Sequence, residues 1–305
     1  MKVLVTGGAG FIGSHIVDAM LAAGHDVAVI DNLSSGYRAN VDDRARLYEV
    51  DIRDADAVDA VFVQEEPEVI SHQAAKANVR ESMVEPVLYA QVNILGSLNL
   101  LEAARRHHTK KLIYASTGGA VYGELEYVPA DENHPIKPLD PYGASKHQVE
   151  HYLYIYSRHY GLDYTVLRYP NVYGPRQDPN GEAGVIAIWA ARMLNNRSTI
   201  IYGTGEQQRD FVFVTDIARA NVLAVNHGNG EIINLGSTIG TSINQVYDLL
   251  SEITGYTQER VYGPAKQGEV FCSYITHEKA ERLLGWQPTV ALKQGLERTV
   301  AACRR

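Results

Sequence analysis

Short apolar runs alternate with amphipathic stretches along the first 115 residues of the chain. The runs are rich in β-branched residues and are bounded by turn-forming or charged residues, which is typical of strands. They lie at residues 2–6, 26–30, 45–50, 68–70 and 111–115. The stretches between them, which repeat apolar positions with the helical period, lie at 11–23, 54–64 and 86–107. This alternation predicts βαβ units, and therefore a parallel sheet with helices on both faces.

The regular alternation of strand and helix patterns becomes less clear in the second half of the chain. A helix is expected at 141–160 and a strand at 163–168, after which Gly, Pro and Asn cluster at 170–184. Further helical patterns, separated by short strands, follow at 182–195, 214–227, 243–254, 277–284 and 292–302. We expect an α/β fold: a doubly wound parallel sheet of the Rossmann type over 1–170, to which some later segments return, and a smaller mixed α/β lobe over 171–305.

Composition narrows the class of protein. Of 305 residues, 45% are hydrophobic and 21% are charged, and the formal net charge is −8, as in an ordinary globular enzyme. An acidic chain with scattered charges is a poor partner for nucleic acid or an anionic membrane. The two cysteines, Cys272 and Cys303, cannot form a disulfide framework, and the histidines lack metal-ligand spacing. We therefore expect a cytoplasmic enzyme with no metal site and no membrane-spanning segment.

A glycine-rich loop follows the first expected strand and begins the first expected helix. It reads Thr-Gly-Gly-Ala-Gly-Phe-Ile-Gly over residues 6–13. Such glycines allow a tight turn and let the backbone approach a pyrophosphate, to which the helix N-terminus offers N–H groups and a positive dipole end. The strand–helix context favours dinucleotide binding over the alternative, a glycine turn that binds nothing.

Acidic residues after the second and third strands bear on which dinucleotide binds. Asp31 follows Gly13 by 18 residues, where a carboxylate can bind the adenosine ribose hydroxyls and repel a 2′-phosphate. This favours NAD over NADP, and Arg38 is interpreted as a solvated loop charge. Asp51 is expected to end the third strand, where it either contacts adenine or caps the next helix.

Tyr142 and Lys146 are spaced one helical turn apart in the helix that Pro141 begins. An ammonium near a phenol favours the phenolate, which lowers a pKa of about 10 toward the range that a general base needs. With 19 tyrosines in the chain, this spacing also arises by chance. The pair gains weight because a segment rich in glycine and hydroxyl groups, 115–123, precedes it at the edge where open α/β sheets bind ligands.

Together, these motifs and their order resemble the extended short-chain dehydrogenase/reductase family and, within it, the UDP-glucose (UDP-galactose) 4-epimerases. The likeness extends over nearly the whole chain. The matching segments are 6–13, 31–36, 51–53, 72–75, 93–96, 116–123, 142–146, 168–174, 205–212 and 268–270.

The resemblance implies a reaction in which NAD stays bound. The Tyr142 phenolate would take the proton of the sugar C4 hydroxyl while the C4 hydride moves to the nicotinamide, and the 4-keto sugar would turn and take the hydride back on its other face. Lys146 would hold the nicotinamide ribose and lower the pKa of Tyr142. The implied cofactor contacts are Gly7, Gly10, Phe11, Ile12, Gly13, Asp31, Asn32, Leu33, Ser34, Ser35, Gly36, Asp51, Ile52, Gln73, Ala74, Ala75, Lys76, Asn93, Tyr142, Lys146 and Pro170.

The resemblance also implies a UDP-sugar site in the C-terminal lobe. Asn171 would contact the diphosphate–sugar and Glu269 the uridine ribose, while Arg209 would bind phosphate, the alternative being an ion pair with Asp210. Tyr202 either lines the uracil slot or packs in the core. The full implied substrate set is Thr117, Tyr142, Asn171, Val185, Tyr202, Arg209, Lys266, Glu269 and Ser273.

The sequence departs from the family pattern at two positions. Where the family usually carries Ser or Thr this chain has Gly118, so either Thr117 reaches the sugar from one residue earlier and joins the catalytic set, or Tyr142 works without a hydroxyl relay. Lys266 stands where the family usually has Arg, which keeps the charge and loses the planar fork.

Three other functions compete with UDP-hexose epimerisation. A 4,6-dehydratase would need an acidic pair where this chain has Gly119 and Ala120. The small Ser273 at the family's gate position leaves a UDP-N-acetylhexosamine or UDP-uronate 4-epimerase open. A non-catalytic NAD sensor would commonly lack the Tyr or the Lys. The resemblance further implies a homodimer packed through residues 86–107 and 141–160.

Overall fold

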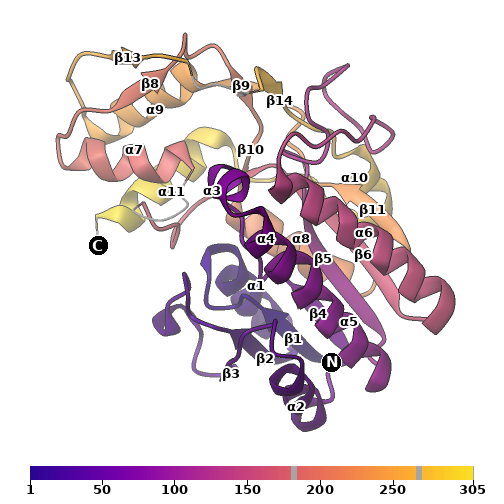
Figure 1. Ribbon diagram of the computed structural model, residues 1–305. Helices are drawn as coiled ribbons and strands as arrows, with labels where there is room; N and C mark the ends of the chain where they lie inside the picture. The colour runs from indigo at the N-terminus through magenta and orange to yellow at the C-terminus, as the bar shows by residue number, and fades with distance from the viewer. Residues whose placement is uncertain (180–183, 266–269, 305) are drawn as a thin grey trace.

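A seven-stranded, fully parallel sheet organises the larger part of the molecule (Figure 1). The computed structural model describes residues 1–179, 184–265 and 270–304. Across the sheet the strands run in the order β11 (Glu231–Asn234), β6 (Asp163–Tyr169), β5 (Lys111–Thr117), β4 (Val69–His72), β1 (Lys2–Thr6), β2 (Asp26–Asp31) and β3 (Arg46–Glu49). This arrangement confirms the predicted Rossmann-type α/β fold. The late strand β11 pairs with β6 at one edge of the sheet.

Helices cover both faces of this sheet because alternate strand residues point to opposite sides. Val3 and Val5 of β1 join one buried apolar cluster, whereas Leu4 joins the other. The first cluster packs against α1 (Phe11–Ala22), α8 (Val214–Ala224) and α10 (Glu278–Leu284). The second packs against α2 (Ala55–Glu65), α5 (Gly96–Arg106) and α6 (Pro141–Tyr160).

The prediction of a helix over 86–107 is confirmed, but the helix changes its hydrogen-bonding pattern along its length. It begins as α4 (Pro86–Tyr89), passes through a π-helical segment η2 (Ala90–Leu95) and continues as α5, with right-handed helical backbone angles at both junctions. In this π-helical segment the buried Asn93 accepts a hydrogen bond from the backbone N–H of Lys76 and donates to the Lys76 carbonyl and the Ser145 hydroxyl. Sequence periodicity missed α3 (Val79–Val84) and the short helix η1 (Arg38–Asn40).

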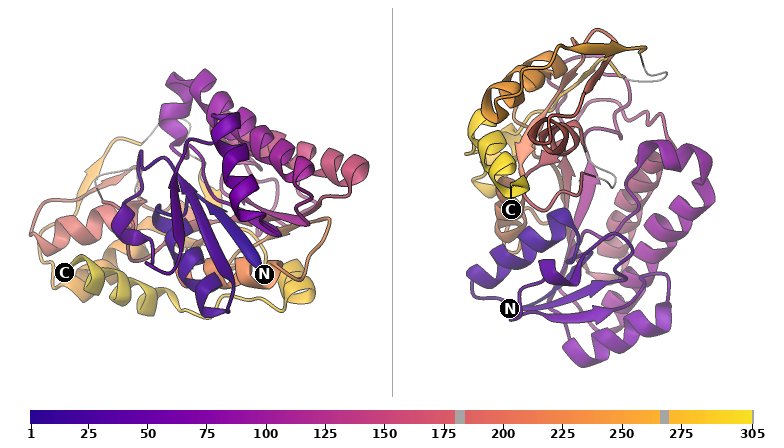
Figure 2. Two further views of the ribbon diagram at one scale, coloured as in Figure 1. Left: turned by 90° about the horizontal axis from the view of Figure 1, so that it is seen from below. Right: turned by 90° about the vertical axis from the view of Figure 1, so that its left-hand side faces the viewer.

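A smaller lobe stands beside the sheet (Figures 1 and 2). Its helices are α7 (Val185–Leu194), α9 (Ile243–Thr254) and α11 (Leu292–Cys303). Its strand pairs are β7 (Asn171–Tyr173) with β10 (Phe211–Phe213), β8 (Ile200–Tyr202) with β13 (Val261–Gly263), and β9 (Gln208–Arg209) with both β12 (Thr241–Ser242) and β14 (Cys272–Ser273). A third apolar cluster, which includes Trp189, Tyr247 and Leu296, fills its interior. Among the described helices, none has the length and apolar character that crossing a bilayer requires.

Candidate active site

The glycine loop has a conformation that side chains would obstruct. Gly7 has a φ of +69°, and a Cβ there would lie 2.7 Å from the backbone nitrogen of Ala74. A Cβ on Gly13 would lie 2.0 Å from the carbonyl oxygen of Gly7. Gly10 is the N-cap residue of α1 and has no side chain to bond the N–H groups of the first turn, where Phe11 begins the helix. The loop and helix start therefore fit a phosphate group.

Asp31 ties the end of β2 to this loop. Its carboxylate accepts hydrogen bonds from the backbone N–H groups of Ala9, at 3.0 Å, and Leu33, at 2.8 Å. The segment that follows packs against the same place, because a Cβ on Gly36 would lie 2.8 Å from the carbonyl carbon of Ala9. Residues 31–36, which are predicted NAD contacts, therefore lie beside the glycine loop.

Of two charged residues near this segment, Arg38 agrees with the sequence interpretation and Asp51 does not. Arg38 forms an exposed ion pair with Glu49 at 3.0 Å, as expected of a solvated loop charge. The prediction that Asp51 ends the third strand is wrong, because β3 ends at Glu49 and Asp51 bonds the side chain and backbone N–H of Arg53. These bonds hold the pKa of Asp51 below its ordinary value. Asp51 also does not cap α2, since Asp54 does.

The segment after β4 is hydrogen-bonded to Thr6 of β1 and to Asn93. The backbone N–H of Ala74 donates to the hydroxyl of Thr6 at 3.2 Å, and that of Gln73 donates to the Thr6 carbonyl. Lys76 donates its backbone N–H to Asn93 Oδ1 at 2.8 Å. Of these predicted cofactor contacts, Gln73 and Ala74 thus meet the start of the glycine loop, while Lys76 is held by Asn93. Ile52 lies buried against Gly96.

Lys146 is buried at the start of α6 with only 4% of its surface exposed. The helix begins where Asp140 accepts a hydrogen bond from the backbone N–H of Gly143 and Pro141 occupies the first turn. Lys146 Nζ donates to the carbonyl of Ala115 at 2.8 Å, and burial lowers its pKa to about 7. Tyr142 lies one turn earlier, so the helix brings the predicted pair to the end of β5.

The segment after β5 passes beside the start of α6. Thr117 is the buried last residue of β5, and a Cβ on Gly143 would lie 2.7 Å from the carbonyl oxygen of Ala120. The departure at Gly118 has a packing reason, because a Cβ there would lie 2.4 Å from Cδ1 of Ile275. The backbone N–H of Gly118 donates to the carbonyl of Tyr169 at 2.7 Å.

A pocket in the small lobe brings together three predicted substrate residues. Asn171, Val185 and Arg209 line it with Val172, Tyr173, Gln177, Gly184, Ile186, Phe211 and Ile243. Pro170 joins β6 to this pocket through β7.

Other predicted substrate residues lie outside the pocket lining or beyond the described residues. Ser273 is buried and pairs with Arg209 in the β14–β9 register, while Tyr202, partly exposed at the end of β8, is not in the pocket lining. Lys266 and Glu269 lie outside the described residues. The carboxylate of Asp210 accepts bonds from the backbone and hydroxyl of Ser237, and burial raises its pKa to about 7.

Sequence reasoning missed Glu150, which is 3% exposed one turn beyond Lys146. Its carboxylate pairs with Arg168 at 2.6 Å and accepts a hydrogen bond from Ser116. A signal was present, since Tyr142, Lys146 and Glu150 are spaced four residues apart and therefore share one helix face. The partners on β5 and β6, however, are adjacent only in the folded chain.

Residues 3–236 match the model of the NAD dependent epimerase/dehydratase family. The chain belongs to this family. Among family members, a UDP-glucose 4-epimerase of Mycolicibacterium smegmatis is 41% identical over 306 residues, covering 98% of this chain and 97% of that protein.

Solved structures of other proteins are similar to this chain over its whole length. A crystal structure of UDP-glucose 4-epimerase with UDP-glucose from Thermotoga maritima is 49% identical, with a TM-score of 0.98, over 100% of this chain and 99% of that one. A Thermus thermophilus UDP-glucose 4-epimerase in complex with NAD is 45% identical, with a TM-score of 0.95 and the same coverage. The expected family and fold are thus confirmed.

Proposed function

We propose that this chain is an NAD-dependent UDP-hexose 4-epimerase that interconverts UDP-glucose and UDP-galactose through a 4-keto sugar. The observation that carries the proposal is the pair Tyr142 and Lys146, which the start of α6 places at the sheet edge shared by the glycine loop. Full-length similarity to proteins that bind NAD and UDP-glucose supports it. The absence of an acid at Gly119 and Ala120 favours epimerisation over dehydration.

Each group in the proposed reaction has a physical reason for its place. Bound NAD supplies a hydride acceptor that later returns the hydride to C4. Tyr142 removes the proton of the C4 hydroxyl and restores it after the sugar has turned. Lys146, held by Ala115, stabilises the phenolate through its positive charge. Thr117 holds the C4 oxygen near Tyr142, and Arg209 with Asn171 binds the diphosphate in the pocket.

The test is product identification by NMR after incubation with UDP-galactose and no added nicotinamide. Wild-type protein should form UDP-glucose, and Tyr142→Phe should lower kcat by about 10²- to 10⁴-fold because the acid–base group is lost. Tyr160→Phe is the matched control, since this tyrosine is an exposed residue at the far end of the same helix. Equal loss in the two variants, or no interconversion by wild type, would contradict the proposal.

A second candidate activity is 4-epimerisation of a UDP-N-acetylhexosamine or a UDP-uronate. The small side chain of Ser273 favours it, because this residue pairs with Arg209 in the sheet that borders the pocket. A panel of UDP-glucose, UDP-N-acetylglucosamine and UDP-glucuronate decides between the substrates. Activity confined to UDP-glucose would exclude the second candidate.

We also infer a homodimer and a cytoplasmic location. Exposed apolar side chains gather on helices that contact one another, with Val84 76%, Val87 67% and Tyr154 56% exposed. An apolar face of this kind is typical of an interface. Light scattering should give twice the chain mass, and Val87→Asp should halve it. The two free cysteines, Cys272 and Cys303, support a reducing compartment, which cell fractionation tests.

A further inference from the structure

A buried polar cluster is centred on Glu150, one helical turn after Lys146 on α6. Glu150 Oε1 accepts hydrogen bonds from Ser116 Oγ at 2.6 Å and from Arg168 Nε at 3.0 Å. Its Oε2 accepts from Arg168 Nη2 at 2.6 Å and lies 3.0 Å from His147 Nδ1. Ser116 follows Ala115, the residue whose carbonyl holds Lys146 Nζ. One carboxylate on α6 is therefore bonded to the strand end that positions the lysine.

The cluster and Lys146 together hold two buried cations and one buried carboxylate, that of Glu150. Lys146 and Arg168 are buried cations, and the charge of the buried Glu150 acts on both. Hydrogen bonds from His147, Arg168 and Ser116 hold the pKa of Glu150 at about 2 against the effect of burial. His72, on β4, is neutral in the working range because burial and then the charge of Lys146 lower its pKa to about 3.

Apart from Tyr142, whose phenolate is the base in the proposed reaction, Tyr114 and Tyr122 are the phenols near this cluster, and neither adds negative charge. The ring of Tyr114 on β5 lies 4.9 Å from Lys146 Nζ, and burial raises the pKa of its phenol well above 10. Tyr122 donates its hydroxyl to Asn234 and accepts from Arg168, so it bonds Arg168 without neutralising it. Burial alone would push the Lys146 pKa down, and the charge of Glu150 opposes that shift.

We propose that Glu150 is a positioning residue for the proposed epimerase reaction: it ties the end of β5 to α6 and supplies the negative charge that keeps the Lys146 ammonium protonated. The inference rests on the proposed function for its kinetic consequence, but not for its electrostatic one. Glu150 itself acts only through Lys146 and Ala115, because its carboxylate is fully engaged with Ser116, Arg168 and His147.

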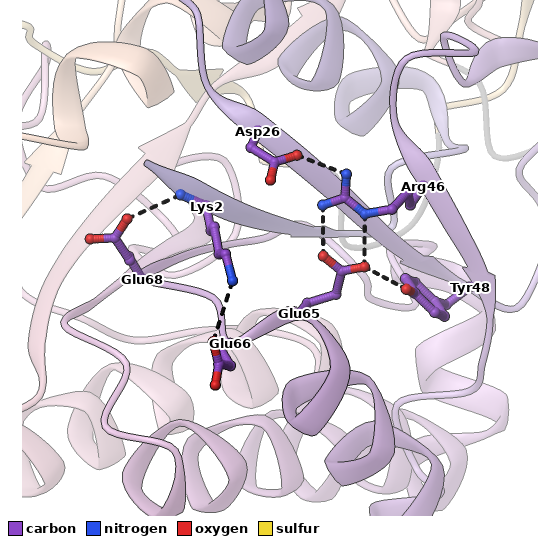
Figure 3. A network of polar contacts seen from close by, with 7 residues as sticks. All are labelled: Lys2, Asp26, Arg46, Tyr48, Glu65, Glu66 and Glu68. Carbon is purple, nitrogen blue, oxygen red and sulfur yellow. Dashed lines mark hydrogen bonds and ion pairs between the residues drawn. The ribbon is translucent and has the colours of Figure 1, made fainter.

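The chain offers a matched control in another buried carboxylate. Glu65, at the end of α2, accepts two hydrogen bonds from Arg46, at 2.8 and 2.6 Å, and one from Tyr48 (Figure 3). Its side chain is 7% exposed, against 2% for Glu150. Arg46 begins β3, so this cluster lies at the amino edge of the sheet, away from the candidate site. Glu65→Gln thus removes a comparable charge and bond set without touching Lys146.

The experiment compares wild type, Glu150→Gln and Glu65→Gln as NAD-loaded full-length proteins. The pKa of Lys146 is measured from its side-chain carbon shift by NMR, and kcat is measured against pH. In Glu150→Gln we expect the Lys146 pKa and the alkaline limb of kcat to move down by about one pH unit, with kcat about tenfold lower above that limb. In Glu65→Gln both should stay at the wild-type values, whatever the loss of thermal stability.

Each outcome decides one of the two proposals. An unchanged Lys146 pKa in Glu150→Gln overturns the positioning role, whether or not the protein epimerises UDP-sugars. If the Lys146 pKa shifts in Glu150→Gln but the wild-type protein converts no UDP-hexose, the role of Glu150 is supported and the proposed function is refuted. If Glu150→Gln does not fold, Ser116→Ala tests the geometric half, because it keeps the charge and removes one bond. It should lower kcat with both pH limbs in place, and an unchanged kcat would overturn that half.

Discussion

The buried histidine at the end of β4 leads to a quantitative prediction about acid stability. His72 is 1% exposed, with Nδ1 2.7 Å from Thr6 Oγ1 and Nε2 2.8 Å from Ser97 Oγ. Burial, reinforced by the nearby charge of Lys146, lowers its pKa from 6.5 to about 3. The folded chain therefore keeps this ring neutral at pH values where an unfolded chain protonates it.

The sign and size of the effect follow from proton linkage. At pH 8 the ring is neutral in both states, so it contributes no pH dependence there. As the pH falls below 6.5, the imidazole binds a proton in the unfolded chain but stays neutral in the folded chain. The free energy of unfolding therefore drops by about 1.4 kcal/mol per pH unit until the pH approaches 3. At pH 5 the summed loss relative to pH 8 is about 2 kcal/mol.

Urea unfolding of wild type and His72→Gln at pH 8 and pH 5 measures this loss. Glutamine retains an amide that can bond the neighbouring hydroxyls, and it does not titrate. The other ionisable groups are common to both proteins, so the difference between their two pH-dependent losses isolates the ring. We expect wild type to lose about 2 kcal/mol more free energy of unfolding than the variant. Equal losses in the two proteins would refute the reasoning, because the ring would then titrate alike in both states.

Three further predictions concern the site. Gly13→Ala should abolish copurification of NAD, measured by absorbance after acid release, because its Cβ would lie 2.0 Å from the carbonyl oxygen of Gly7. Arg209→Lys should raise KM about tenfold with little change in kcat, since a point charge replaces a bidentate phosphate contact, and a larger effect on kcat would contradict a binding role. Burial raises the pKa of Asp210 to about 7, so this residue makes the stability of the protein fall as the pH rises from about 4 to 7. Asp210→Asn should remove this pH dependence of the melting temperature. The same pH dependence in wild type and variant would contradict the prediction.

Local signals account for the elements that sequence analysis placed best. The helix expected at 141–160 is α6 (Pro141–Tyr160), because Asp140 caps its start and Gly161, with a φ of +72°, ends it. Both signals depend on residues within the helix or next to it. The helix over 86–107 was predicted as well, but its π-helical segment η2 was not, and in that segment Asn93 bonds residues that are 17 and 52 positions away. No local pattern contains that information.

The same division applies to the candidate site. The glycine loop, the carboxylate of Asp31 and the spacing of Tyr142 and Lys146 were predictable, because turn geometry and helical spacing depend on neighbours in the chain. The packing that excludes a side chain at Gly118 was not predictable, since Ile275, which occupies that space, is far away in the sequence.

The sequence by itself determined the alternation of strands and helices that makes the parallel sheet, the family and the positions of the candidate reacting groups. Tertiary structure alone decided the electrostatic state of those groups. Lys146 has a lowered pKa because strands β4 and β5 bury it, and it meets an opposing charge from Glu150, which Arg168 of β6 holds in place. Burial and charge are sums over groups brought together from separate strands, and for that reason they cannot be derived from the spacing of residues along the chain.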